Sequence, residues 1–314
     1  MSYITTILTL AIASCVSLLL ASLGEMVNQR AGVFNLGCEG IMSVGAFLGM
    51  LVPYMVGHGG ATSGVYNVLG LLLATAVGAL LGLFFAVFVV TFRAPQGIAG
   101  IGLQMFGVGA AGTLFRHFIG GTQSVPGIAT HPIPLLSRIP FLGKVFFSQN
   151  PLVYLAFACV PLTWYLLFKT PWGLKVRASG TTPRAADSIG INVSRIRYES
   201  LAFGGAMAGL AGAYLSLCQA KMFSDTLISG RGFIAVALVY FGHWQPVKIM
   251  WGALLFSLAQ TFQNVMQSLG INFPYEFAVM LPYVLVIVVL AFDRESQRLG
   301  PTALGAPFNR EIRT

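Results

Sequence analysis

The sequence predicts an all-α protein that crosses a membrane several times. Of its 314 residues, 56% are hydrophobic and only 9% are charged, whereas a soluble domain carries about 25% charged residues. The apolar residues form runs of about twenty, the length that an α-helix needs to cross roughly 30 Å of hydrocarbon. The 37 glycines suit this class because glycine lets membrane helices approach closely. We therefore expect one transmembrane domain over residues 1–314.

Nine apolar runs qualify as membrane spans. No basic region precedes the first run, so it is interpreted as a retained span rather than a cleavable signal. The fourth run opens with closely spaced glycines, and the seventh has Arg231 and two glycines at its head, so both are candidates for broken or re-entrant helices. The predicted spans are 3–23, 38–56, 66–91, 97–117, 151–168, 199–218, 227–243, 249–269 and 276–292.

The basic residues gather between the spans and predict an orientation. If the loop 169–198 is cytoplasmic, the alternation of nine spans places about thirteen Lys and Arg residues on that side and four on the other. Such a positive-inside bias predicts an N-terminus outside the cell and a cytoplasmic tail at 293–314. The net charge of +9 is then explained by orientation in the membrane rather than by nucleic-acid binding.

Similar features recur in the two halves of the chain in the same order. The segment 32–35 opens one span and Gly-Ala-Leu-Leu at 78–81 lies in the next, while 231–234 opens a span and Gly-Ala-Leu-Leu at 252–255 follows. The two sets cross in opposite directions, as in the inverted repeats of many transporters. A chance match of common membrane residues remains open. The predicted repeats are about 1–117 and 199–292, joined by the fifth span.

The loop 169–198 contains a short helix with signals for both of its ends. Thr182 suits an N-cap, Pro183 suits the first helical position, and Gly190 suits the position just past the C-terminus. Such a small, rigid helix between two spans is suited to docking into a groove of another protein. An ordinary ordered loop helix is the alternative.

Three motifs carry a resemblance to a known family. They are Glu25 with Arg30-Ala31-Gly32 and the following Asn-Leu-Gly-x-Glu-Gly, the segment 229–235, and the tail 300–307. Nearly end to end, the chain resembles permease subunits of bacterial ABC importers for nucleosides, ribose and branched-chain amino acids, with the nucleoside (simple sugar) type closest. Cys38 and the aromatic segment 240–244 depart from the family pattern.

The resemblance implies the partners and the role of the loop helix. It implies a separate ABC ATPase subunit, a second paralogous permease and a substrate-binding lipoprotein in a bacterial inner membrane. The chain itself has no Gly-x-x-x-x-Gly-Lys-Ser/Thr phosphate loop, so it is not expected to be an enzyme or to need a cofactor. The implied coupling helix, which contacts the ATPase, comprises Thr182, Pro183, Arg184, Ala185, Ala186, Asp187 and Gly190.

Charged residues inside apolar spans are functional or structural candidates. Glu25 and Arg30 flank one turn and are predicted to form an ion pair, while Glu39 is placed near a cytoplasmic helix end. Arg231 is predicted either to pair with Asp225 or to act as a gate near the outer mouth.

The substrate path needs hydrogen-bonding groups and aromatic faces, which fit ribose hydroxyls and a flat base. Each candidate can also be a plain contact between helices. No metal site is expected, because neither the four His nor the four Cys residues show metal-ligand spacing. The path candidates are Asn35, Gln104, Phe106, Gln219, Phe233 and Gln260.

Two other classes are weighed against the importer. An ion-coupled secondary transporter usually needs an acidic residue deep in the membrane, and Glu276 is the best candidate although it is predicted to lie near the outer surface. An intramembrane enzyme ranks last because no nucleophile–base pair or metal cluster is evident.

Overall fold

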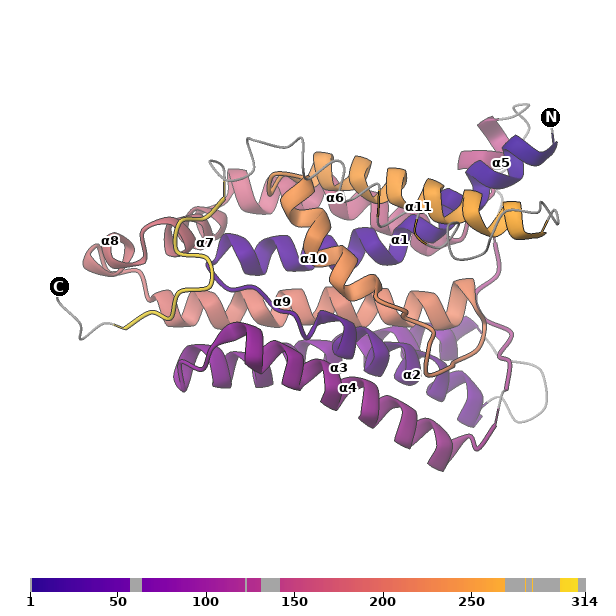
Figure 1. The fold of residues 1–314 in the computed structure, drawn as a ribbon, viewed down its shortest axis with the longest axis horizontal. Helices are drawn as coiled ribbons and strands as arrows, with labels where there is room; N and C mark the ends of the chain where they lie inside the picture. The colour runs from indigo at the N-terminus through magenta and orange to yellow at the C-terminus, as the bar shows by residue number, and fades with distance from the viewer. Residues whose placement is uncertain are drawn as a thin grey trace.

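The computed structural model describes residues 2–56, 64–121, 123–130, 142–268 and 300–309, with single positions at 280 and 284. Within these residues the regular secondary structure is helical, and one isolated β-bridge joins Ser124 to Met222. The helices run side by side in an elongated bundle (Figure 1). The predicted span 276–292, including Glu276, lies almost wholly outside the described residues.

The helix boundaries follow the predicted spans closely. Two long helices, α3 and α9, continue without a break into short π-helical segments, η1 and η3. The elements are α1 (Ser2–Arg30), α2 (Cys38–Val56), α3 (Gly64–Ala86), η1 (Val87–Thr91), α4 (Gln96–Phe118), α5 (Leu142–Phe146), α6 (Pro151–Lys169), α7 (Pro171–Thr181), α8 (Pro183–Ser188), α9 (Val193–Tyr214), η3 (Leu215–Gln219), α10 (Arg231–Phe241) and α11 (Pro246–Ser268).

Six helices in the described part of the chain are long and apolar enough to cross a membrane: α1, α2, α3 with η1, α4, α6, and α9 with η3. This confirms a multi-pass helical protein but not the count of nine spans. The helix α4 is continuous, so the break considered at its glycine-rich start is absent. In contrast, α10 has only 11 residues, too few to cross a bilayer alone.

The centre of the bundle is a set of close backbone contacts that we call the glycine seam: Gly45, Gly78, Gly82, Gly205, Gly209 and Gly212, where α2 and α3 meet α9. A Cβ atom added at Gly212 would stand 1.9 Å from the backbone oxygen of Met42, and one at Gly82 would stand 2.1 Å from that of Leu201. Glycine is therefore required here by the separation of the helices, as in tightly packed membrane bundles.

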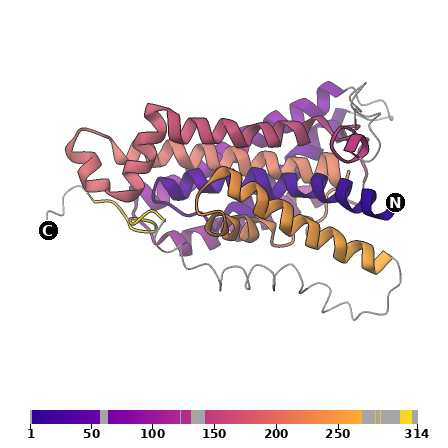
Figure 2. The same ribbon diagram turned by 90° about the horizontal axis from the view of Figure 1, so that it is seen from above.

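The two ends of the bundle differ. The short helices α7 and α8 and the segment 300–309 gather at one end, and the N-terminus lies at the other (Figures 1 and 2). The segment 300–309 is bound to several elements at its end of the bundle. Ala303 N–H donates to Gly180 O at 3.0 Å, and Gly305 N–H donates to Gly32 O at 3.2 Å. We call this segment the clasp.

Candidate functional site

The first part of the candidate site is the coupling segment, residues 171–192, which links α6 to α9. Thr170 Oγ1 accepts a hydrogen bond from Gly173 N–H at 3.1 Å, which caps α7. Thr182 occupies the N-cap position of α8 with Pro183 next, as predicted, but its side chain makes no capping hydrogen bond. The start of α8 is therefore fixed by proline rather than by a hydroxyl cap.

The end of α8 is a Schellman motif. Gly190 has a φ of +89°. Its N–H donates to Asp187 O at 3.0 Å, and Ile191 N–H donates to Ala186 O at 3.0 Å. These two bonds satisfy carbonyl groups that a helix end leaves open. They confirm the predicted stop at Gly190.

One face of α8 is anchored and the rest is exposed. Ala186 is 2% exposed, whereas Arg184 and Ala185 are exposed. Directly before the glycine stop, Ile189 is 76% exposed. Ile189 is not among the residues predicted from the sequence, although an isoleucine beside a predicted helix stop in a polar loop is a recognisable signal. An apolar side chain presented in this way suits burial against another protein.

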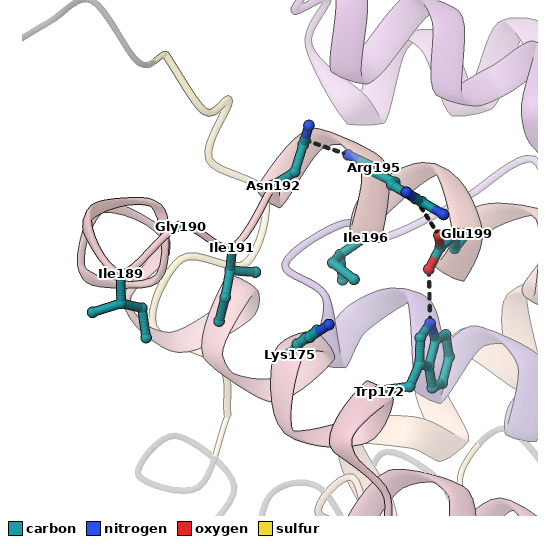
Figure 3. Close-up of a pocket in the computed structure, with 9 residues that line it drawn as sticks. All are labelled: Trp172, Lys175, Ile189, Gly190, Ile191, Asn192, Arg195, Ile196 and Glu199. Carbon is teal, nitrogen blue, oxygen red and sulfur yellow. Dashed lines mark hydrogen bonds and ion pairs between the residues drawn. The ribbon is translucent and has the colours of Figure 1, made fainter.

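A groove of about 570 Å³ separates α7 from the start of α9 (Figure 3). On one side of it, Trp172 Nε1–H donates to Glu199 Oε2 at 2.9 Å. Arg195 Nε–H donates to Glu199 Oε1, also at 2.9 Å. The Trp172 bond joins α7 to α9, and the Arg195 bond, within α9, orients the Glu199 carboxylate. Ile189, Ile191 and Ile196 supply the apolar part of the lining.

The clasp makes hydrogen bonds to several elements at this end of the bundle. Arg197 of α9 is 1% exposed, and its Nη1–H donates to Ala306 O at 3.0 Å. Thr302 Oγ1–H donates to Thr181 O at the end of α7. The coupling segment, α9 and the turn after α1 are therefore joined through one extended piece of chain.

The turn after α1 is organised by Glu25. Its Oε1 accepts from Asn35 N–H at 2.9 Å and from Gln29 Nε2–H at 3.2 Å. The predicted ion pair with Arg30 is wrong: Arg30 Nη2–H donates instead to Trp244 O at 3.0 Å. The reason is that Arg30 lies at the helix end, whereas Glu25 lies about 7.5 Å further in along α1.

Glu39 joins the beginnings of two helices. It lies in the first turn of α2, and its Oε1 accepts from Gly230 N–H, the N-cap residue of α10, at 2.9 Å. A carboxylate is favoured there because helix N-termini carry positive partial charge. Glu39 is only 9% exposed, and its second oxygen has no hydrogen-bond partner. It lies at the helix end where the sequence placed it, and its side chain is buried there.

Asp225 has a different ion-pair partner from Arg231, the partner considered from the sequence. Asp225 forms an ion pair with Arg116 at 2.8 Å, reaching across to α4. Arg231 Nη1–H donates to Gln219 Oε1 at 3.2 Å, and Gln219 Nε2–H donates to Ser14 Oγ at 3.1 Å. Two candidates from different classes, a path residue and a gating residue, are thus brought together, and Gln219 lies in the π-helical segment η3.

The other path candidates lie apart. Asn35 is buried and its Oδ1 accepts from Gly37 N–H at 2.8 Å, which shapes the turn before α2. The backbone of Gln104 lies against Gly40 of α2. Phe106 is 56% exposed in an outward groove beside Phe84.

Phe233 and Gln260 complete the set of path candidates. Phe233 on α10 is partly exposed, and Gln260 on α11 has a buried carbonyl oxygen without a hydrogen-bond partner. Within the described chain, no hydrogen bond or ring contact joins these two residues to each other or to Asn35, Gln104 or Phe106. Among the predicted path and gating residues, the structure joins Gln219 to Arg231 and, at the turn after α1, Asn35 to Glu25.

Comparisons with known proteins cover almost the whole chain. The family described as "Branched-chain amino acid transport system / permease component" matches residues 5–290. The guanosine ABC transporter permease protein NupQ of Bacillus subtilis is 37% identical over 93% of this chain and 92% of its own length. No solved structure matches the chain.

Two further relatives are similar over comparable lengths. The putative glucose ABC transporter permease protein TsgC13 of Haloferax volcanii is 34% identical over 99% of this chain and 100% of its own length. The nucleoside ABC transporter permease protein NupC of Lactococcus lactis is 36% identical over 87% of both chains. With its bundle of apolar helices, this chain belongs to the permease component family of branched-chain amino acid transport systems.

Proposed function

We propose that this chain is the permease subunit of an ABC importer and forms the translocation path for a nucleoside or a related sugar-containing solute. Two of its similar relatives are named for guanosine and for nucleosides, and a third is named for glucose. The observation that carries the importer proposal is the coupling segment, whose exposed and firmly anchored helix α8 is built to receive force from a partner.

ATP hydrolysis takes place on a separate ATPase subunit in this proposal. The exposed residues Arg184 and Ala185 enter a groove of that subunit, and Ile189 adds an apolar contact. The fixed link between Trp172 and Glu199 then passes a displacement of α8 to α9, whose close contacts pass it to α2 and α3.

The remaining features of the assembly follow the same proposal. A second paralogous permease and a substrate-binding lipoprotein complete it in a bacterial inner membrane. The N-terminus is outside, and the end that carries α7, α8 and the clasp is cytoplasmic. The domain is divided into inverted repeats at about 1–117 and 199–292, and the Arg231–Gln219 contact acts as a gate on the outer side.

The first experiment is purification of the tagged chain in mild detergent from its native host, with mass spectrometry of the co-purifying proteins. We expect an ATPase subunit and a second permease. The assembly, reconstituted in liposomes with its binding protein, should import radiolabelled guanosine only with ATP. Uptake by the chain alone without ATP would overturn the importer proposal, and ATP-driven uptake of glucose but not guanosine would overturn the nucleoside assignment.

The coupling role of α8 has its own test. Replacing Arg184 and Asp187 together with alanine should lower ATP-driven uptake at least about tenfold, the scale of losing a central interface residue. The amount of inserted chain should stay unchanged. Ser194→Ala, on the exposed first turn of α9, is the matched control and should transport normally. Unchanged uptake in the double variant would contradict the role of α8.

A further inference from the structure

Three basic side chains gather on the aromatic residues at one end of α6. The guanidinium carbon of Arg30 is 5.8 Å from the ring centre of Phe168, and that of Arg177 is 5.1 Å from the same centre. Lys169 Nζ lies 5.6 Å from the ring centre of Trp164. The rings of Phe168 and Trp164 are 6.3 Å apart, so the cluster is continuous. We call it the basic cluster.

The charges of the basic cluster are not neutralised by the described part of the chain. The ion pairs found there are Arg116–Asp225 and Arg195–Glu199, and neither involves the cluster. The hydrogen bond of Arg30 goes to a backbone carbonyl, that of Trp244. The Nε–H groups of Arg30 and Arg177 are buried without a hydrogen-bond partner in the described chain. Buried donors on charged groups are costly when they remain unpaired.

Helix dipoles explain only part of this arrangement. Arg30 and Lys169 are the last residues of α1 and α6, where a positive charge offsets the negative helix end. Arg177 lies before the last turn of α7 and gains no such benefit. Two guanidinium groups beside one ring also repel each other, and the ring faces offset that repulsion only modestly. An anion bound at the two guanidinium groups would offset the repulsion between them.

The surroundings of the basic cluster match a membrane boundary. Trp164 and Tyr165 on α6 are 42% and 58% exposed. Tryptophan and tyrosine are enriched at the level of lipid headgroups. Further along the same helix, Leu155 and Leu162 are also exposed, which gives an apolar surface that leads away from the charges. A ligand that fits both parts has an anionic head and long apolar chains.

We propose that Arg30, Lys169 and Arg177 bind the phosphate of an anionic phospholipid, whose acyl chains lie along the exposed face of α6. Arginine suits this task because its planar group donates two parallel hydrogen bonds to a phosphate. The inference is independent of the transported solute and of the ATPase subunit, because it needs only that the bundle is embedded in a bilayer.

The test uses the isolated full-length chain, so that no partner subunit contributes. Native mass spectrometry and thermal unfolding are measured with phosphatidylglycerol, with phosphatidylcholine and with inorganic phosphate. The test variant is Arg177→Gln with Lys169→Gln, and Arg30 is left in place because it also holds the Trp244 turn. The matched control is Lys248→Gln, an exposed residue in the first turn of α11 that removes one positive charge outside the cluster.

We expect wild-type chain to retain phosphatidylglycerol and to unfold at a higher temperature with it than with phosphatidylcholine. The double variant should lose affinity for phosphatidylglycerol on the order of thirtyfold, from two charges near the membrane surface. Lys248→Gln should lose no more than about fivefold, the share of one charge near the membrane surface. Equal binding by the double variant would overturn the proposal, and so would inorganic phosphate alone giving the full stabilisation, which would indicate a site for soluble phosphate.

Discussion

The glycine seam and helix α8 of the coupling segment differ in how closely they pack against the rest of the protein. In the seam, α2, α3 and α9 meet through their backbones, and the carbonyl of Met42 occupies the space that a Cβ of Gly212 would need. In the coupling segment, α7 also packs by backbone, since a Cβ added at Gly180 would stand 2.2 Å from Arg30 O, but α8 beyond it buries only Ala186. Helices whose backbones touch cannot move relative to one another without a clash. A helix such as α8, with most of its side chains exposed, has room to move.

This difference assigns a mechanical role to each region. The seam makes α2, α3 and α9 move as one body, since any sliding would drive backbone atoms together. In the proposed function, α8 is the part of the coupling segment that receives motion from the ATPase subunit and passes it to that body. The three predictions that follow test this contrast, each with a residue from one of the two regions.

The largest effect is expected in the seam. Gly212→Ala should reduce the free energy of unfolding by about 3 kcal/mol, because a methyl group is forced against backbone that has no room to move. The matched control is Gly109→Ala on α4, where an added Cβ meets no atom within 4 Å. The measurement is the fraction of monodisperse protein that remains after heating in detergent. Similar melting of both variants would argue against a rigid seam.

A smaller effect is expected at Gly190. Gly190→Ala meets no steric obstacle but must adopt a φ of +89°, which costs about 1–2 kcal/mol. Local loss of the α8 stop should lower ATP-driven uptake while the bundle melts as wild type. Gly190→Asn is the control, because asparagine tolerates this backbone region better and should restore part of the uptake. If both variants melt early, α8 is part of the rigid body rather than the part that passes motion to it.

The smallest effect is expected at Trp172. Trp172→Phe keeps the apolar ring but removes the N–H that donates to Glu199, at a cost of about 1 kcal/mol. Limited proteolysis should then cleave the coupling segment faster without a change in the melting of the bundle. Trp251→Phe, a mostly exposed tryptophan on α11, is the control. Equal cleavage rates in the two variants would show that the bond does not hold α7 in place.

The sequence predicted the elements whose signals are local. Pro183 and Gly190 mark the ends of α8 because they act on their own backbone, and apolar length marked the six helices that are long enough to cross a membrane. The sequence did not predict contacts that depend on how distant segments pack together. Arg30 finds the carbonyl of Trp244, more than two hundred positions away, rather than Glu25 on its own helix.

The two π-helical ends and the role of Glu39 show the same limit. No residue type from Leu215 to Gln219 indicates a change from α-helix to π-helix. This change nevertheless sets the position at which Gln219 accepts a hydrogen bond from Arg231. Glu39 was recognised as an unusual charge, but its partner is the backbone of Gly230, which belongs to the other half of the chain. Backbone partners carry no side-chain signature, so only the fold reveals them.

The clasp also sets an order of events during synthesis. Arg197 and the carbonyl groups of Gly32 and Gly180 are made long before residues 303–306, which bind them. A growing chain inserts its helices from the N-terminus onward. The hydrogen bonds of the clasp therefore form only after residues 303–306 have been synthesised. A chain cut short before residue 303 therefore lacks the hydrogen bonds that join Gly32, Gly180 and Arg197 to the clasp.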